Sequence, residues 1–73
     1  MFVEGQLVRQ KMTRRTGWVE SILEDNGPHA AGVVMILVEM RDGLRTRKYF
    51  NPSDLSAVRS HGEIVTREVA RWT

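Results

Sequence analysis

The residues of this chain that are best suited to chemistry are arginines that stand close to aromatic side chains. Arg45, Arg47 and Tyr49 alternate along one segment, and alternation on a strand places all three on one face. Guanidinium groups bind phosphates, while aromatic rings stack on bases or cations. The pattern predicts a nucleic-acid-binding face, to which we add four residues expected near that strand: Arg14, Arg15, Trp18 and Arg41.

Two other interpretations of this face stay open. A strand that faces solvent can alternate charges for solubility and to protect a sheet edge, with no ligand at all. Trp18, Tyr49 and Phe50 can instead form an aromatic cage for a methylated lysine or arginine, if the three rings share one rim. Alternation opposes the cage, because it puts Tyr49 and Phe50 on opposite faces.

A second group of candidate site residues is apolar and is expected to point away from the core. Exposed apolar surface of this extent is typical of an interface with another protein or another copy. The alternative function is therefore protein–protein interaction or oligomerisation through the sheet edge and the C-terminal tail. The simpler explanation is that the tail covers the outer face of the third strand. The residues concerned are Met35, Leu37, Val65, Val69 and Trp72.

Catalysis and metal binding find no support in the residue types. The chain has no cysteine, which excludes disulfides and cysteine-ligated zinc. The only histidines, His29 and His61, stand in separate Gly-containing segments, and no glycine-rich phosphate loop or nucleophile–base arrangement is present. We expect a binding module rather than an enzyme, with no cofactor, no metal and no small-molecule substrate.

Composition narrows the possible partners. The net charge is only +2, although nine of the eleven basic residues are arginine. Because the bulk charge is so small, nucleic-acid binding requires the arginines to cluster on one face. The longest apolar run, residues 33–38, is too short to span a membrane, and the N-terminus does not resemble a signal peptide. We therefore expect no membrane partner and a cytoplasmic location.

The sequence predicts five short β-strands with turns between them. Strands are expected within residues 3–11, 17–23, 33–40, 44–50 and 55–58, and a loop over residues 24–32. Asp42-Gly43 predicts a two-residue hairpin turn, and Asn51 to Asp54 a proline-containing turn. This spacing favours a mainly β fold, a small closed or partly open barrel.

The third segment has the strongest strand pattern and sets the core. If Glu39 faces solvent, alternation turns Val34, Ile36, Val38 and Met40 inward. Val8 and Leu55 are expected to join them from the first and last strands. On the fourth strand, Leu44, Thr46 and Phe50 should share the inner face, with Lys48 at the rim.

The C-terminal segment, residues 60–73, has a different pattern. Ser60 and Glu63 match a helix capping box, and Val65, Val69 and Trp72 follow with helical spacing. The spacing predicts a short helix of two to three turns. A helix this short is not stable alone, so the tail must dock on the barrel, pair with another chain or stay mobile.

The order of these features resembles the small SH3-like and Tudor-like barrels. The resemblance covers residues 3–59 and is carried by four motifs: Gly5-x-x-Val8-Arg9, Gly17-Trp18-Val19 with Ile22, Val38-x-x-x-Asp42-Gly43, and Pro52-x-Asp54-Leu55-x-x-Val58. It implies a five-stranded SH3-like barrel over residues 1–59, followed by the tail. Similar barrels are accessory modules of bacterial helicases and of transcription proteins, which fits a nucleic-acid-binding role.

One enzyme family, the plasmid-borne type II dihydrofolate reductases, has a similar short barrel. Its members carry a Val-Gln-Ile-Tyr stretch before a proline. The stretch before Pro52 is Lys48-Tyr49-Phe50-Asn51, which lacks the glutamine and has the tyrosine out of register. We therefore do not expect that activity here.

Overall fold

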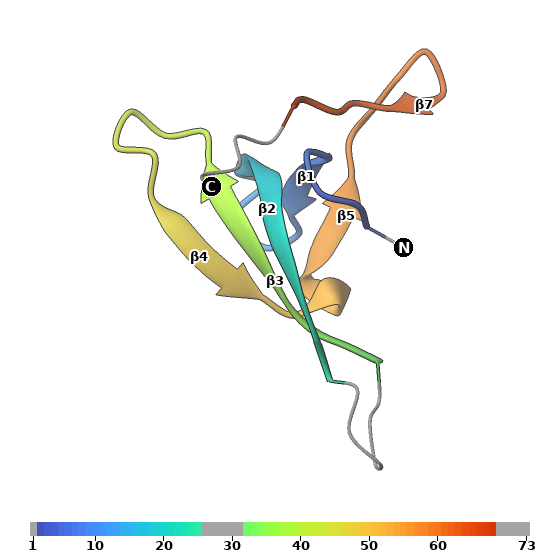
Figure 1. The fold of residues 1–73 in the computed structure, drawn as a ribbon. Helices are drawn as coiled ribbons and strands as arrows, with labels where there is room; N and C mark the ends of the chain where they lie inside the picture. The colour runs from blue at the N-terminus through green and yellow to red at the C-terminus, as the bar shows by residue number, and fades with distance from the viewer. Residues whose placement is uncertain (1, 26–31, 69–73) are drawn as a thin grey trace.

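A computed structural model describes residues 2–25 and 32–68 and shows a mainly β chain (Figure 1). The expected loop over residues 24–32 falls largely outside this range. The five main strands are β1 (Leu7–Gln10), β2 (Thr16–Asp25), β3 (Gly32–Met40), β4 (Arg47–Phe50) and β5 (Leu55–Ala57). A single 3-10 turn, η1 (Pro52–Asp54), links β4 to β5, and two short strands follow, β6 (Arg59–Ser60) and β7 (Glu63–Ile64). Among the described residues, no helix is long and apolar enough to cross a membrane.

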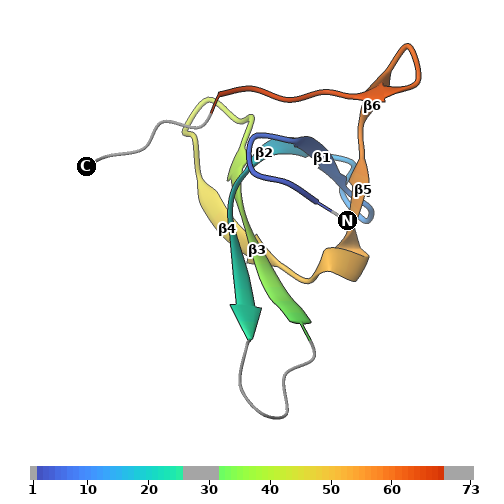
Figure 2. The same ribbon diagram turned by 45° about the vertical axis from the view of Figure 1, so that its right-hand side comes forward.

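The five main strands form one antiparallel sheet in the order β4-β3-β2-β1-β5. The first four strands make a meander, and β5 returns to pair with β1. The sheet curves around the core, so that β4 and β5 lie at its two edges (Figure 2). No pairing between described residues joins these edges, so the five-stranded β architecture is confirmed but closure into a barrel is not.

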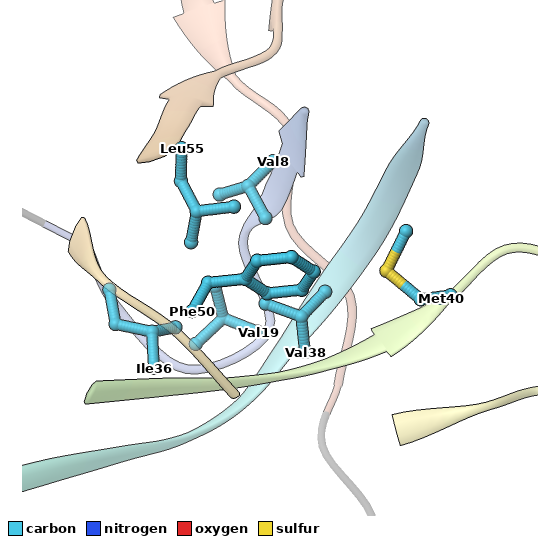
Figure 3. Close-up of a cluster of buried hydrophobic side chains, with 7 residues drawn as sticks. All are labelled: Val8, Val19, Ile36, Val38, Met40, Phe50 and Leu55. Atoms are coloured by element: carbon cyan, nitrogen blue, oxygen red, sulfur yellow. The ribbon is translucent and has the colours of Figure 1, made fainter. Parts of the chain in front are cut away.

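The core lies on the concave side of the sheet, where seven apolar side chains meet (Figure 3). The predicted inward register is confirmed for Ile36, Val38 and Met40, and the side chain of Val34 lies outside those described. Val19 pairs directly with Val38, and Phe50 with Ile36, so that neighbouring strands contribute side chains to the same layer. The cluster consists of Val8, Val19, Ile36, Val38, Met40, Phe50 and Leu55.

The connection between β3 and β4 is longer than predicted. Met40 donates its backbone amide to the carbonyl of Thr46, so that the loop between this pair contains five residues. The Asp42 carboxylate accepts hydrogen bonds from the backbone amides of Leu44 and Thr46 and from the Thr46 hydroxyl. The prediction of a two-residue turn at Asp42-Gly43 is therefore wrong, because the Asp42 side chain stabilises a wider loop.

The wider loop also shortens the fourth strand. Arg45 adopts a left-handed conformation with φ of 51°, which a strand residue does not, so the strand begins only at Arg47. Leu44 is 84% exposed and does not reach the core, contrary to prediction. Phe50 is buried as predicted, and Lys48 is exposed although it pairs with buried Val38.

Over the described residues that follow Ser60, up to residue 68, a hairpin and an extended segment take the place of the predicted helix. His61 and Gly62 both have positive φ, 53° and 81°, and form the two-residue turn between β6 and β7. This hairpin projects from the sheet (Figures 1 and 2). The β-branched residues after it favour extended backbone, and this preference outweighs the capping-box pattern. Val69 and Trp72 lie outside the described residues.

After the hairpin, the tail returns to the first strand. Thr66 forms an antiparallel bridge with Gln6. Leu7 donates its amide to the carbonyl of Val65, and Arg67 donates its amide to the carbonyl of Gly5. Residues 5–7 thus lie between β2 on one side and the tail on the other, and Leu7 is 6% exposed although it lies outside the core cluster.

Candidate functional site

The indole ring of Trp18 lies at the centre of the candidate site. Trp18 is the third residue of β2 and is half-buried, and it pairs with Leu7 of β1 and with Glu39 of β3. Direct partners in an antiparallel sheet share a face, and Trp18 alternates with buried Val19. The ring is therefore on the convex face of the sheet, opposite the core.

Two guanidinium groups lie against this ring. The Cζ atom of Arg67 is 5.1 Å from the ring centroid and that of Arg41 is 5.9 Å away. Both distances fall within the range of cation–π attraction, which arises because the face of an aromatic ring carries negative charge. Trp18 thus restrains two arginines that come from distant parts of the chain.

Arg67 reaches the ring because the tail pairs with the first strand. The backbone bond from Arg67 to Gly5 fixes the end of the tail, and the Arg67 side chain then extends to the Glu39 carboxylate, with Nη2 to Oε2 at 3.0 Å. The two side chains are 38% and 22% exposed. Arg67 therefore links the tail to both β2 and β3.

Arg41 is positioned by the end of β3. Its backbone amide donates to the carbonyl of Thr16, which extends the β2–β3 ladder by one bond. Asp42 then holds the following loop, and the left-handed conformation of Arg45 turns that loop back towards β4. Local backbone geometry thus brings Arg41 and Arg45 to the same end of the sheet.

Two adjoining hollows connect these arginines, and we call them together the arginine groove. One hollow, of about 300 Å³, is lined by Trp18, Glu39, Met40, Arg41, Asp42, Arg45 and Arg67. The other, of about 310 Å³, is lined by Arg14, Arg15, Thr16, Met40, Arg41 and Asp42. Because both hollows share the segment from Met40 to Asp42, they lie side by side, with Arg41 common to both.

The turn before β2 supplies the far end of the groove. Gln10 accepts a backbone bond from Arg14 and donates one to Arg15, so the chain reverses tightly at this point. Arg14 has a positive φ of 61°, and Thr13 supports the turn through hydrogen bonds to Gln10 and Arg15. Both arginine side chains are exposed on this turn.

The groove has an excess of positive charge. Five arginines line it against two carboxylates, those of Glu39 and Asp42. Glu39 is paired with Arg67, and the Thr46 hydroxyl lowers the pKa of Asp42, so that Asp42 stays charged and engaged within its loop. Within the described part of the chain, four of the arginines form no ion pair: Arg14, Arg15, Arg41 and Arg45.

The structure divides the residues that the sequence singled out as nucleic-acid-binding. Arg47 and Tyr49 do not line the groove: Arg47 forms an ion pair with Glu20 at 2.6 Å, and Tyr49, 59% exposed, pairs with Leu37. The residues brought together along the groove are Arg14, Arg15, Trp18, Arg41 and Arg45.

Sequence reasoning missed Arg67 and Glu39 as parts of the site. The helical interpretation of the tail hid Arg67. A strand interpretation, which the β-branched run Ile64-Val65-Thr66 favours, would have allowed Arg67 to approach the sheet. Glu39 was expected to face solvent, yet its ion pair with Arg67 covers it in part.

The other candidate residues have different surroundings. Phe50 lies in the core, so Trp18, Tyr49 and Phe50 do not share the rim that an aromatic cage needs. Met35, Leu37 and Val65 are half-buried, and none of them belongs to the core cluster.

The described histidine, His61, and the described carboxylates do not form a cluster. His61 is exposed in the turn between β6 and β7, and His29 is outside the described residues. Over residues 2–25 and 32–68, no group of His, Cys, Asp or Glu is arranged to hold a metal ion.

Comparison with known proteins adds no relative: no family model, no curated protein and no solved structure matches the chain. The arginine groove is therefore the main structural indication of a function.

Proposed function

We propose that this protein is a non-catalytic binding module that contacts nucleic acid through the arginine groove. The observation that carries the proposal is the convergence of five arginines and Trp18 on two adjoining hollows, although the net charge of the chain is only +2. Charge that is concentrated in this way attracts a polyanion locally, even when the bulk charge is small.

Arginine suits phosphate better than lysine does. Its planar guanidinium donates two parallel hydrogen bonds to a phosphate, and it remains charged at any physiological pH. Trp18 restrains the side chains of Arg41 and Arg67, which lowers the entropy that these residues lose when they bind a ligand. Phosphate contacts of this kind position a nucleic acid without reading its sequence.

The proposal also includes the fold family. The four-stranded meander, with η1 leading into a β5 that pairs with β1, supports an SH3-like architecture whose strand edges stay apart. Nucleic-acid binding by a module of this kind agrees with the resemblance drawn from the four sequence motifs. The fold alone does not determine a function, so the groove remains the main support.

A protein-interaction role is the second candidate, favoured by apolar exposure along one edge of the sheet. Tyr49 of the edge strand β4 is 59% exposed, and Leu44 just before it is 84% exposed. Unpaired strand edges can accept an additional strand. Arg47 and Lys48 are exposed on the same edge and oppose such pairing.

The test measures binding to fluorescein-labelled 20-nucleotide DNA, single-stranded and duplex, by fluorescence anisotropy at several salt concentrations. We expect affinity to fall steeply with salt, because each contacted phosphate releases counterions. Arg41→Gln should weaken binding and reduce the slope of log Kd against log salt by about 0.7 to 0.9.

Arg59→Gln is the matched control for this test. It removes the same charge from β6, in the projecting hairpin (Figure 1), and Arg59 lines neither hollow of the groove. We expect it to change the affinity by less than the groove variant does. Equal weakening by both variants would show that the groove is not a nucleic-acid site, and no binding of either DNA form in dilute salt would exclude DNA as its ligand.

A further inference from the structure

We propose that the ligand of the arginine groove is a single strand of nucleic acid rather than a duplex. This inference rests on the proposed function and names its substrate class. It is carried by the shape of the groove, by the stacking surface inside it and by the position of its two carboxylates.

The shape of the groove favours a single strand. The arginines line two concave hollows of about 310 and 300 Å³, at the lower end of the volumes that enclose small ligands. Each hollow suits a single nucleotide and does not admit a base-paired helix. A duplex would contact only the exposed ends of these arginine side chains, outside both hollows.

Arg41 and Trp18 form a stacking surface within the groove. Arg41 is common to both hollows, so a strand that occupies both must pass over its guanidinium. This group lies 5.9 Å from the centroid of the Trp18 ring. Single strands expose base faces that stack on aromatic rings and on guanidinium planes, whereas the bases of a duplex already stack on one another.

The two carboxylates are the third argument. Glu39 and Asp42 line the groove between the arginines, and there they would repel any phosphate placed beside them. Carboxylates instead accept hydrogen bonds from the amino groups of bases. A single strand can set its phosphates against the arginines and turn the Watson–Crick edges of its bases towards Glu39, whereas in a duplex those edges are paired.

The experiment uses the fluorescence of Trp18 in the full chain. The chain contains two tryptophans, so Trp72→Phe leaves Trp18 as the only one. The probes are a mixed-sequence 12-nucleotide DNA strand, the RNA strand of the same sequence, and the DNA duplex of that sequence, all at one salt concentration. We expect a single strand to bind about tenfold more tightly than the duplex and to change the Trp18 emission, because the stacking of one base is worth about 5- to 150-fold in affinity.

The results separate this inference from the proposed function. Tighter binding of either the DNA or the RNA strand supports a single-stranded ligand and identifies which strand it is. Duplex that binds as tightly as both strands would overturn the inference but leave nucleic-acid binding intact. If none of the three probes binds, the proposed function itself fails.

Arg41→Lys provides a second test, in a variant that should fold like the parent chain. It keeps the charge but removes the flat stacking surface, and Arg41 is exposed. We expect this variant to lose most of its preference for single strands while the slope of log Kd against log salt stays unchanged. Arg59→Lys is the control and should keep the full preference. An unchanged preference in Arg41→Lys would exclude stacking on Arg41 as its source.

Discussion

The guanidinium of Arg67 lies 5.1 Å from the centre of the Trp18 ring, although 48 positions separate the two residues in the chain. This contact connects the C-terminal tail to the second strand, and the ion pair between Arg67 and Glu39 extends the connection to the third strand. The tail is therefore part of the surface that forms the arginine groove. Its backbone pairing with residues 5–7 is what brings Arg67 to that position.

The first prediction concerns this pairing. Deleting residues 65–73 should lower the free energy of unfolding by about 2–4 kcal/mol, because it removes two backbone hydrogen bonds to Gly5 and Leu7 and exposes Leu7. Deleting only residues 69–73 is the control, and the difference between the two truncations gives the contribution of residues 65–68. Urea unfolding followed by circular dichroism measures both. Equal stability of the two truncated chains would contradict the pairing.

The Arg67 side chain should contribute much less than the tail backbone. Arg67→Ala removes an ion pair and a cation–π contact that are partly exposed to solvent, so we expect a loss of about 0.5–1.5 kcal/mol. Raising the salt concentration should shrink the difference from the parent chain, because salt screens exposed charges. A loss as large as that of the 65–73 truncation would mean that the side chain, not the backbone, holds the tail.

The third prediction tests the core. Ile36 is 1% exposed and lies among the side chains of the cluster, so Ile36→Ala should cost about 2–5 kcal/mol. Leu44→Ala is the control, since Leu44 is 84% exposed and its truncation should change stability by less than about 0.5 kcal/mol. Thermal unfolding distinguishes the two. If Ile36→Ala unfolds at the same temperature as the parent chain, the inward register of β3 is wrong.

The fourth prediction concerns the close approach of β2 and β3 beside the site. A Cβ atom on Gly17 would lie 2.5 Å from Val38 Cγ1 and 2.7 Å from the Glu39 carbonyl oxygen, closer than van der Waals contact allows. Gly17→Ala should therefore destabilise the domain by about 1–3 kcal/mol through overpacking. Gly43→Ala meets no atom within 4 Å and should leave the unfolding midpoint nearly unchanged.

The fifth prediction is a dependence on pH. The Thr46 hydroxyl, and then its backbone amide, lower the pKa of Asp42 below its usual value of 3.8. A carboxyl with a depressed folded-state pKa contributes stability above its unfolded pKa, and this contribution is lost as the pH falls through the folded-state pKa. Asp42→Asn should therefore be less stable than the parent chain at neutral pH, and the difference should shrink from about pH 5 downward.

Urea unfolding midpoints at a series of pH values measure this difference. Thr46→Val is the companion variant, because it removes the donor with the largest effect on the pKa of Asp42. In the Thr46→Val background, replacing Asp42 by asparagine should produce a smaller pH-dependent difference. A difference between Asp42→Asn and its parent that stays constant down to the acid end of the series would contradict the proposed loop structure.

Several features of this protein were determined by the sequence because they depend on local periodicity. Alternation predicted which residues of β3 face the core, and Ile36, Val38 and Met40 are buried accordingly. The residue types predicted a mainly β chain. The arginines and Trp18 were also recognised as candidate ligands of phosphate and bases, since that chemistry belongs to the side chains themselves.

Other features were decided only by tertiary structure. The sequence was compatible with a two-residue turn at Asp42-Gly43 and with a helix after Ser60, because both patterns are satisfied by several backbone conformations. Hydrogen bonds to the Asp42 carboxylate selected a wider loop, and that loop separates groove-lining Arg45 from Arg47, which pairs with Glu20.

The tail gives the clearest case. Residues 65–67 are extended because their backbone groups find partners in residues 5–7, about sixty positions earlier. Local pattern contains no information about such a distant pairing, since its free energy comes from hydrogen bonds and burial that exist only in the folded chain. The sequence thus showed which residue types could form the arginine groove. Which residues line it, with Arg67 among them and Arg47 not, was decided by the fold.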